Sequence, residues 1–168
     1  MRYPSTCPIC GGALVYPTGS EKAPILLIGE FPGWMEMQAH TVWIGQAGTV
    51  LKAELRRVGI DYKACRATNV WMHLPCKDPK EIDWHRKQAS AEMRGRKAIL
   101  LIGSDVSKIF LDKPVSDVNG LAFKLKSFDN TPVVAAINPA QMLNDDGTMG
   151  EVRFAIEKFG ELVGRLKC

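Results

Sequence analysis

The chain has 168 residues, of which 46% are hydrophobic and 24% are charged, and its formal net charge is +4. This composition is ordinary for a globular protein with one buried core, and no apolar run approaches the roughly 18 residues that a membrane-spanning helix needs. The N-terminus lacks the apolar core of a signal peptide, so we expect a cytoplasmic protein. We also expect it to be a monomer that does not bind membranes. The mild positive charge permits nucleic acid as a partner without requiring it.

The first half of the chain alternates between predicted strands and helices. After an irregular segment of about 22 residues, the sequence PILLIG (24–29) is a continuous apolar run that predicts a strand buried on both faces. Residues 46–58 carry apolar side chains at helical spacing and are followed by Gly59, and residues 65–71 predict a second strand that ends near Asn69. Residues 78–97 predict a polar helix with Asp78 as its N-cap.

The second half repeats this alternation. Residues 97–106 predict a strand, a glycine and the start of a helix, and residues 131–142 predict a strand that runs into a turn at Asn138. Residues 150–167 predict an amphipathic helix. The pattern indicates an α/β protein with a parallel sheet, in which functional residues gather where the strands end.

The sequence CPICGG near the N-terminus is a Cys-x-x-Cys knuckle, which presents the thiolates of Cys7 and Cys10 to one metal ion. The chain has five cysteines, and this odd number argues against a framework of disulfides. The alternative is a knuckle that holds no metal.

Five short motifs resemble those of the family 4 uracil-DNA glycosylases, in the same order along the chain. They are GEFPG (29–33), WIGQAG (43–48), TNVW (68–71), LLIG (100–103) and NPAQML (138–143). The resemblance implies a single domain over residues 1–168, folded as a three-layer α/β/α sandwich around a four-stranded parallel sheet, with an N-terminal metal-binding knuckle. It also implies an enzyme that flips a base out of DNA and hydrolyses its N-glycosidic bond.

The resemblance assigns a role to each motif residue. Glu30 would position the attacking water and stabilise positive charge on the sugar. Trp43 would stack on the flipped base, unless it is an ordinary core tryptophan. Asn69 would read the edge of the base with its amide, unless it only shapes a turn. The remaining members of the first motif would line the substrate pocket: Gly29, Phe31, Pro32 and Gly33.

The last motif departs from the family pattern, which has His-Pro where this chain has Asn138 and Pro139. Asn138 can donate a hydrogen bond to the departing base or to the attacking water, but it cannot become cationic. Met142 lies where relatives insert an apolar wedge into DNA, and core packing is its alternative role. Together with Phe31, this departure indicates a substrate other than plain uracil in DNA, so the expected substrate is uracil or a modified pyrimidine. The alternative functions are a catalytically weak DNA- or partner-binding relative and a base-modifying enzyme.

The family pairs its knuckle with two later cysteines to hold a [4Fe-4S] cluster. His73 and His85 lie in the corresponding positions here, and Cys76 could replace either of them. Two thiolates and two imidazoles suit a structural zinc ion better than a cluster, so zinc is the expected cofactor and [4Fe-4S] its alternative.

Overall fold

The computed structural model describes residues 3–75, 78–143 and 147–166. The strands are β1 (Ile25–Gly29), β2 (Arg66–Asn69), β3 (Ala98–Ile102), β4 (Ala122–Leu125) and β5 (Thr131–Ala136). The α-helices are α1 (Trp34–Ala39), α2 (Gln46–Arg57), α3 (Pro79–Met93), α4 (Ser104–Leu111), α5 (Val115–Val118) and α6 (Thr148–Arg165). Short 3-10 helices span Tyr62–Ala64, Lys126–Phe128 and Pro139–Leu143. None of the described helices is long and apolar enough to cross a membrane.

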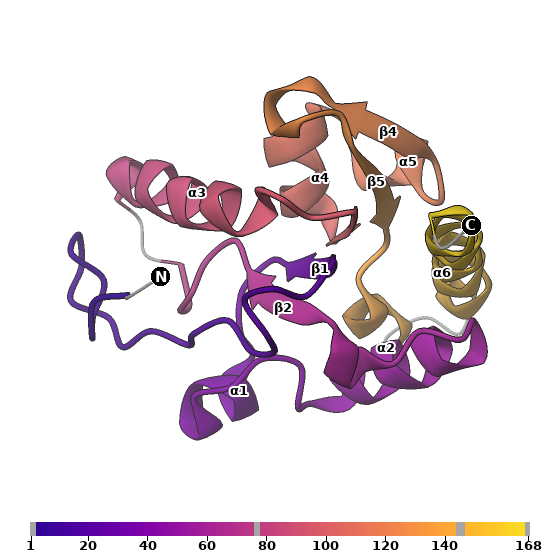
Figure 1. Cartoon of the computed structure of the whole chain (residues 1–168). Coiled ribbons are helices and arrows are strands. Elements are labelled where there is room, and N and C mark those ends of the chain that lie inside the picture. Colours follow the sequence, from indigo (N-terminus) through magenta and orange to yellow (C-terminus); the bar gives the residue numbers. More distant parts are fainter. Residues whose placement is uncertain (1–2, 76–77, 144–146, 167–168) are drawn as a thin grey trace.

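The strands form one sheet in the order β2-β1-β3-β5-β4 (Figure 1). The parallel part, β2-β1-β3-β5, confirms the predicted parallel sheet. The prediction of a four-stranded sheet was wrong, because β4 adds a fifth strand that pairs antiparallel with β5. This edge strand is short, and its residues are exposed or only half-buried, so it has no apolar run that marks it in the sequence.

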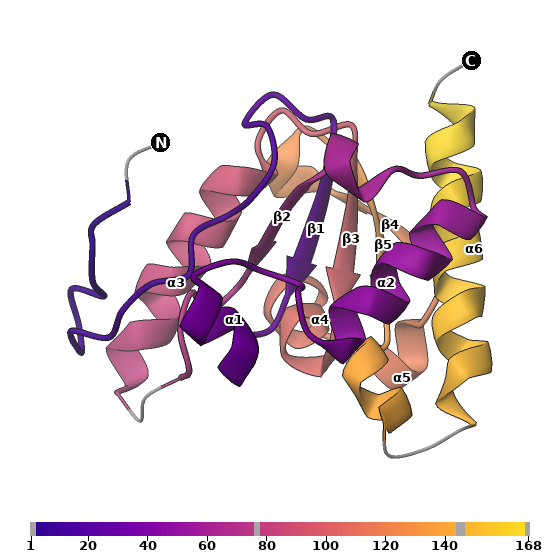
Figure 2. The ribbon, with the colours of Figure 1, turned by 90° about the horizontal axis from the view of Figure 1, so that it is seen from below.

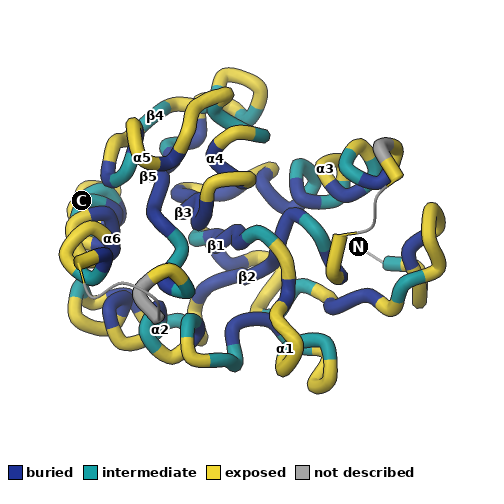
Figure 3. Tube along the Cα trace, turned by 180° about the vertical axis from the view of Figure 1, so that it is seen from behind, coloured by how far each residue is buried: buried dark blue, intermediate teal, exposed yellow. Residues whose placement is uncertain are grey.

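Helices cover both faces of the sheet. On one face, α2 and α6 pack against alternate strand residues such as Leu27, Leu100 and Val134. On the other face, α3 and α4 pack against the residues between them, such as Leu26 and Ile99. Figure 3 shows the strands as the buried centre, with exposed residues along the outer sides of the helices. This alternation explains why the strands read as continuous apolar runs, and it gives the expected α/β/α layers.

The four parallel strands end at one edge of the sheet. Figure 2 shows their arrowheads pointing to this edge, where α1, the start of α2 and the 3-10 helix after β5 also lie. Helix α3 starts as predicted, because the Asp78 carboxylate accepts a hydrogen bond from the amide of Lys80 at 2.9 Å. Helix α1 was not predicted, because it has only six residues, none of them buried, and so short a segment shows no sustained helical period.

A buried ion cluster fastens the N-terminal segment to the opposite end of the sheet. The Glu92 carboxylate accepts two hydrogen bonds from Arg66, each 2.9 Å long, one from Arg96 at 3.0 Å and one from the Tyr3 hydroxyl at 2.6 Å. Burial acts to raise the pKa of Glu92, but the hydrogen bonds from Arg66 and Tyr3 outweigh it and lower the pKa.

We predict that Glu92→Gln lowers the free energy of unfolding by about 3–5 kcal/mol, because it leaves buried guanidinium charge without a counter-ion. Urea denaturation at neutral pH measures this loss. The lowered pKa of Glu92 means that its contribution is present above the unfolded value of 4.5 and is lost as the pH falls through the folded value. The difference between the two proteins should therefore shrink in acid.

Glu161→Gln is the matched control, because Glu161 pairs with Lys158 at 2.9 Å on the exposed side of α6. This variant should unfold like the wild type. A Glu92→Gln protein as stable as the control would contradict a structural role for the cluster.

Candidate active site and metal centre

A cavity of about 540 Å³ opens at the edge where the parallel strands end. Its lining includes Glu30 just after β1, Asn69 at the end of β2 and Asn138 just after β5. Trp43 and the loop residues Phe31, Pro32 and Gly33 also line it. The fold thus brings four separate sequence motifs to one cavity, whose volume is typical of a small-molecule site.

Two hydrogen bonds hold the Glu30 carboxylate at this edge. Its Oε1 accepts from the backbone amide of Asp105 at 3.0 Å, in the first turn of α4. Its Oε2 accepts from Nδ2 of Asn138 at 2.9 Å. Gly103, with φ of +111°, makes this position possible, because a Cβ there would collide with the Glu30 side chain. The carboxylate is therefore fixed by groups at the ends of two neighbouring strands.

The orientation of the Asn138 amide is also determined. Its Oδ1 accepts a hydrogen bond from the amide of Ala140 at 3.0 Å, so its Nδ2 must face Glu30. An amide nitrogen carries two hydrogens, and the second one remains for a ligand or a water molecule.

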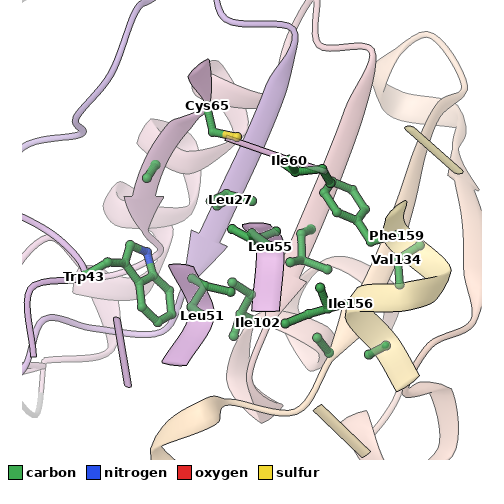
Figure 4. Close-up of a cluster of buried hydrophobic side chains, with 14 of the residues drawn as sticks. Leu27, Trp43, Leu51, Leu55, Ile60, Cys65, Ile102, Val134, Ile156 and Phe159 are labelled. Atoms are coloured by element: carbon green, nitrogen blue, oxygen red, sulfur yellow. The ribbon is translucent and has the colours of Figure 1, made fainter. Parts of the chain in front are cut away.

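Trp43 forms a wall of the cavity and also closes one end of a hydrophobic core. It is 7% exposed, and Figure 4 shows its indole beside Leu51 at the margin of the core cluster. Its ring packs so closely over Gly29 that a Cβ on this glycine would collide with it. Packing in the core and lining the cavity are therefore compatible, since the same indole ring does both.

The backbone at Trp43 has φ of +59°, an unusual conformation for an aromatic residue. Glu36 on α1 holds the adjoining backbone, because its Oε1 accepts hydrogen bonds from the amides of Ile44 at 3.1 Å and Gly45 at 2.8 Å. The sequence gives no sign of this role for Glu36, because a lone acid there reads the same whether its carboxylate faces solvent or the backbone.

Asn69 lies beside Trp43 and has a free amide. The residue is 6% exposed, and its side chain makes no hydrogen bond to any residue in the described part of the chain. Its Oδ1 lies directly over Gly29, the partner of Asn69 in the β1–β2 register. The donor and the acceptor of this amide are therefore available to a ligand in the cavity.

Met142 falls in the 3-10 helix after β5, close to Ala140 and Gln141 of the cavity lining. Its side chain lies outside the described part of the structure, so its role as a wedge stays a prediction.

The predicted metal ligands come together away from the cavity, between the N-terminal segment and α3. One donor atom each from Cys7, His73, Glu81 and His85 lies within 4.8 Å of the others, and all of these residues are buried. Cys10 joins them, with its Sγ 3.5 Å from Nε2 of His73. Cys76 lies outside the described residues.

Glu81 was not predicted as a member of this group. Its Oε1 is 2.9 Å from Nε2 of His73 and 3.7 Å from Nε2 of His85. The signal was available in the sequence, because residues four positions apart on α3 share one helix face, as Glu81 and His85 do.

The protonation of the group suits a metal ion. Burial and the neighbouring His73 lower the pKa of His85 to about 4, so this ring is neutral at pH 7. Burial acts to raise the pKa of the Cys7 thiol, but hydrogen bonds from His73 and from the backbone of Cys10 and Ile9 lower it overall. Both shifts favour the forms that donate electron pairs to a cation.

The Nδ1 atoms of His73 and His85 make different hydrogen bonds. Nδ1 of His73 donates to the Leu74 carbonyl at 2.6 Å, so Nε2 is the nitrogen that would bind a metal. Nδ1 of His85 accepts from the Met72 amide at 3.3 Å. Coordination through Nε2 of His85 requires a proton on its Nδ1, so the contact with Met72 would open when metal binds.

Comparison with known proteins places this arrangement in a family. A sequence model described as the uracil DNA glycosylase superfamily matches residues 16–159, which include all the cavity residues named above. A type-4 uracil-DNA glycosylase from Archaeoglobus fulgidus is 24% identical over 163 residues, covering 88% of this chain and 80% of that protein. The chain therefore belongs to the uracil DNA glycosylase superfamily.

Proposed function

We propose that the protein is a DNA glycosylase that hydrolyses the N-glycosidic bond of uracil or a modified pyrimidine flipped out of DNA. The observation that carries this proposal is the Glu30 carboxylate, held at the cavity by Asp105 and Asn138 at 3.0 and 2.9 Å. A fixed carboxylate can orient a water molecule towards the sugar carbon and stabilise the positive charge that develops there.

The other cavity residues provide what base recognition needs. The face of Trp43 offers a stacking surface for an extruded base. The free amide of Asn69 offers one donor and one acceptor, which match the carbonyl and N–H groups on the edge of a uracil-like base. The cavity therefore presents a stacking wall, an edge reader and a water-positioning acid to one ligand.

We predict that Glu30→Gln lowers the rate of base release by at least about 100-fold, because it removes the charge and the proton acceptor. The assay uses single- and double-stranded oligonucleotides that carry uracil, hydroxymethyluracil or a thymine mismatch, followed by alkaline cleavage at abasic sites. Absence of abasic product with every base would contradict the proposal, as would full activity in the variant.

In this proposal Asn138 orients Glu30 and uses its second Nδ2 hydrogen on the water or on the departing base. Asn138→Asp would place a second carboxylate beside Glu30. The acid limb of the pH–rate profile should then move to higher pH, because two adjacent carboxylates do not both ionise freely. Asn130→Asp is the control, because it adds the same charge in the exposed turn before β5 and should leave the profile unchanged. An identical profile in both variants would exclude a contact between Asn138 and Glu30.

A second candidate function is DNA binding without efficient catalysis. The observation that favours it is the composition of the cavity, since its described lining residues include no Lys, Arg or His to stabilise an anionic leaving base. Tight binding of oligonucleotides without any base release would identify this function.

We further propose that the cysteine–histidine group holds one structural zinc ion. Zinc lies about 2.3 Å from sulfur and about 2.0–2.1 Å from nitrogen, so neighbouring ligands of a tetrahedral site lie roughly 3.3–3.8 Å apart. The corresponding separations are 3.5 Å for Cys10 and His73, 3.9 Å for Cys7 and His85, and 3.1 Å for the two histidines. These spacings support a single ion rather than a four-iron cluster. The ion would fasten the knuckle to His73 and to α3.

We predict about one zinc per chain by elemental analysis, and its loss in Cys7→Ser and His73→Ala. Loss of the ion should lower the melting temperature by about 2–4 °C for each kcal/mol of binding energy removed. Cys65→Ser is the control, because Cys65 is buried but lies in the hydrophobic core under α2. Stoichiometric iron and sulfide in the purified protein would contradict the zinc assignment.

A further inference from the structure

The metal centre contains more donor groups than one zinc ion needs. Structural zinc sites almost always have four ligands, and the ion proposed above already has them in Cys7, Cys10, His73 and His85. Glu81 adds a carboxylate from the first turn of α3, and this residue is only 1% exposed. One of its oxygens lies within 4.8 Å of a donor atom from each of Cys7, His73 and His85. The centre therefore has five donors for four positions.

Glu81 and Cys10 both lie next to the same imidazole nitrogen. Oε1 of Glu81 is 2.9 Å from Nε2 of His73, and Sγ of Cys10 is 3.5 Å from the same nitrogen. The carboxylate oxygen and the sulfur are 3.7 Å apart. Either atom can therefore reach a coordination position beside His73 after a small movement of its side chain.

The contact between Glu81 and His73 also indicates a cation. Nδ1 of His73 donates its hydrogen to the Leu74 carbonyl, so Nε2 presents a lone pair to the carboxylate. Two lone pairs at this distance repel each other unless a proton or a metal ion lies beside them. An ion bound at Nε2 would attract the carboxylate as well, which makes Glu81 a ligand within reach.

The two thiolates of the knuckle differ in their access to solvent. Cys7 is 1% exposed, and hydrogen bonds of 2.8 Å hold its amide to the Gly12 carbonyl and its carbonyl to the Gly11 amide. Cys10 is exposed. Exposed thiolates are the ones that oxidants and competing ligands attack. Cys10 is therefore the ligand that the centre loses most readily.

From these distances and exposures we infer that Cys10 and Glu81 share the fourth coordination position, and that Glu81 takes it when Cys10 is lost. Cys7, His73 and His85 stay bound in both forms. The exchange breaks a zinc–sulfur bond and forms a zinc–oxygen bond. It replaces one anionic ligand with another, so the charge of the centre does not change. The inference rests on the proposed zinc ion.

The test measures the zinc content of the full chain by elemental analysis and its zinc affinity by competition with a chromophoric chelator. Cys10→Ser and Glu81→Gln should each keep about one zinc per chain and lose less than about 100-fold in affinity, because the other donor fills the position. The double variant should lose at least about tenfold more than the product of the two single losses, because neither donor remains.

A milder pair of variants tests the same exchange if the double variant does not fold. Glu81→Asp keeps the carboxylate but shortens its reach. It should leave zinc affinity unchanged in the wild type, where Cys10 holds the position. In the Cys10→Ser background it should lower the affinity at least about tenfold.

Asp83→Asn is the matched control, because Asp83 is another acid of α3 whose side chain is 66% exposed and pairs with Arg86 at 3.2 Å. Combined with Cys10→Ser, it should bind zinc as Cys10→Ser does alone. An affinity as low as that of the Cys10→Ser/Glu81→Gln protein would overturn the inference, because the charge of α3 rather than ligation would then retain the ion.

Loss of zinc from Cys10→Ser alone would also overturn the inference, since Glu81 would not have replaced the thiolate. The same holds if Glu81→Gln changes nothing in the Cys10→Ser background. Failure of the zinc proposal itself is seen in the wild type before any variant is made, as absence of zinc or as stoichiometric iron and sulfide.

Discussion

The hydrogen bonds to the Glu30 carboxylate are the constraint on which the rest of the site depends. Their donors, Asp105 and Asn138, are 75 and 108 residues away from Glu30 in the sequence. They meet only when β1, β3 and β5 pair in their observed register. Gly103 completes the arrangement, because any side chain there would displace the carboxylate. The order of the sheet therefore positions the acid, and these two contacts need no separate folded element.

Packing and the proposed base recognition share the same atoms at Trp43. Its ring closes one end of the core beneath α2 and also walls the cavity, and its backbone is held in a left-handed conformation by the contacts of Glu36 with the next two amides. An unusual conformation at a functional residue persists only when its surroundings determine it fully. This coupling explains why α1, a helix without a fully buried residue, is nevertheless part of the site.

The sequence was sufficient to predict the parallel strands, because runs such as Ile25–Gly29 are buried on both faces and contain no polar interruption. It was insufficient for β4 and α1, whose side chains are mostly exposed and follow no apolar period. The motifs that follow the strands in the sequence predicted which residues lie together, because the ends of parallel strands meet at one edge of the sheet. The roles of Glu36 and Glu81 were not predicted, because a sequence does not distinguish a carboxylate that points inwards from one that faces solvent. Only the three-dimensional contacts distinguish them.

Three features meet at one edge of the sheet: a fixed acid, an aromatic wall and an amide with unused hydrogen-bonding groups. The most direct measurement is a crystal structure of the Glu30→Gln protein with single-stranded DNA that carries uracil. The account predicts the uracil stacked against Trp43, with its edge bonded to the Asn69 amide and a water molecule between residue 30 and the sugar. A base bound outside this cavity, or one whose edge does not contact Asn69, would contradict it.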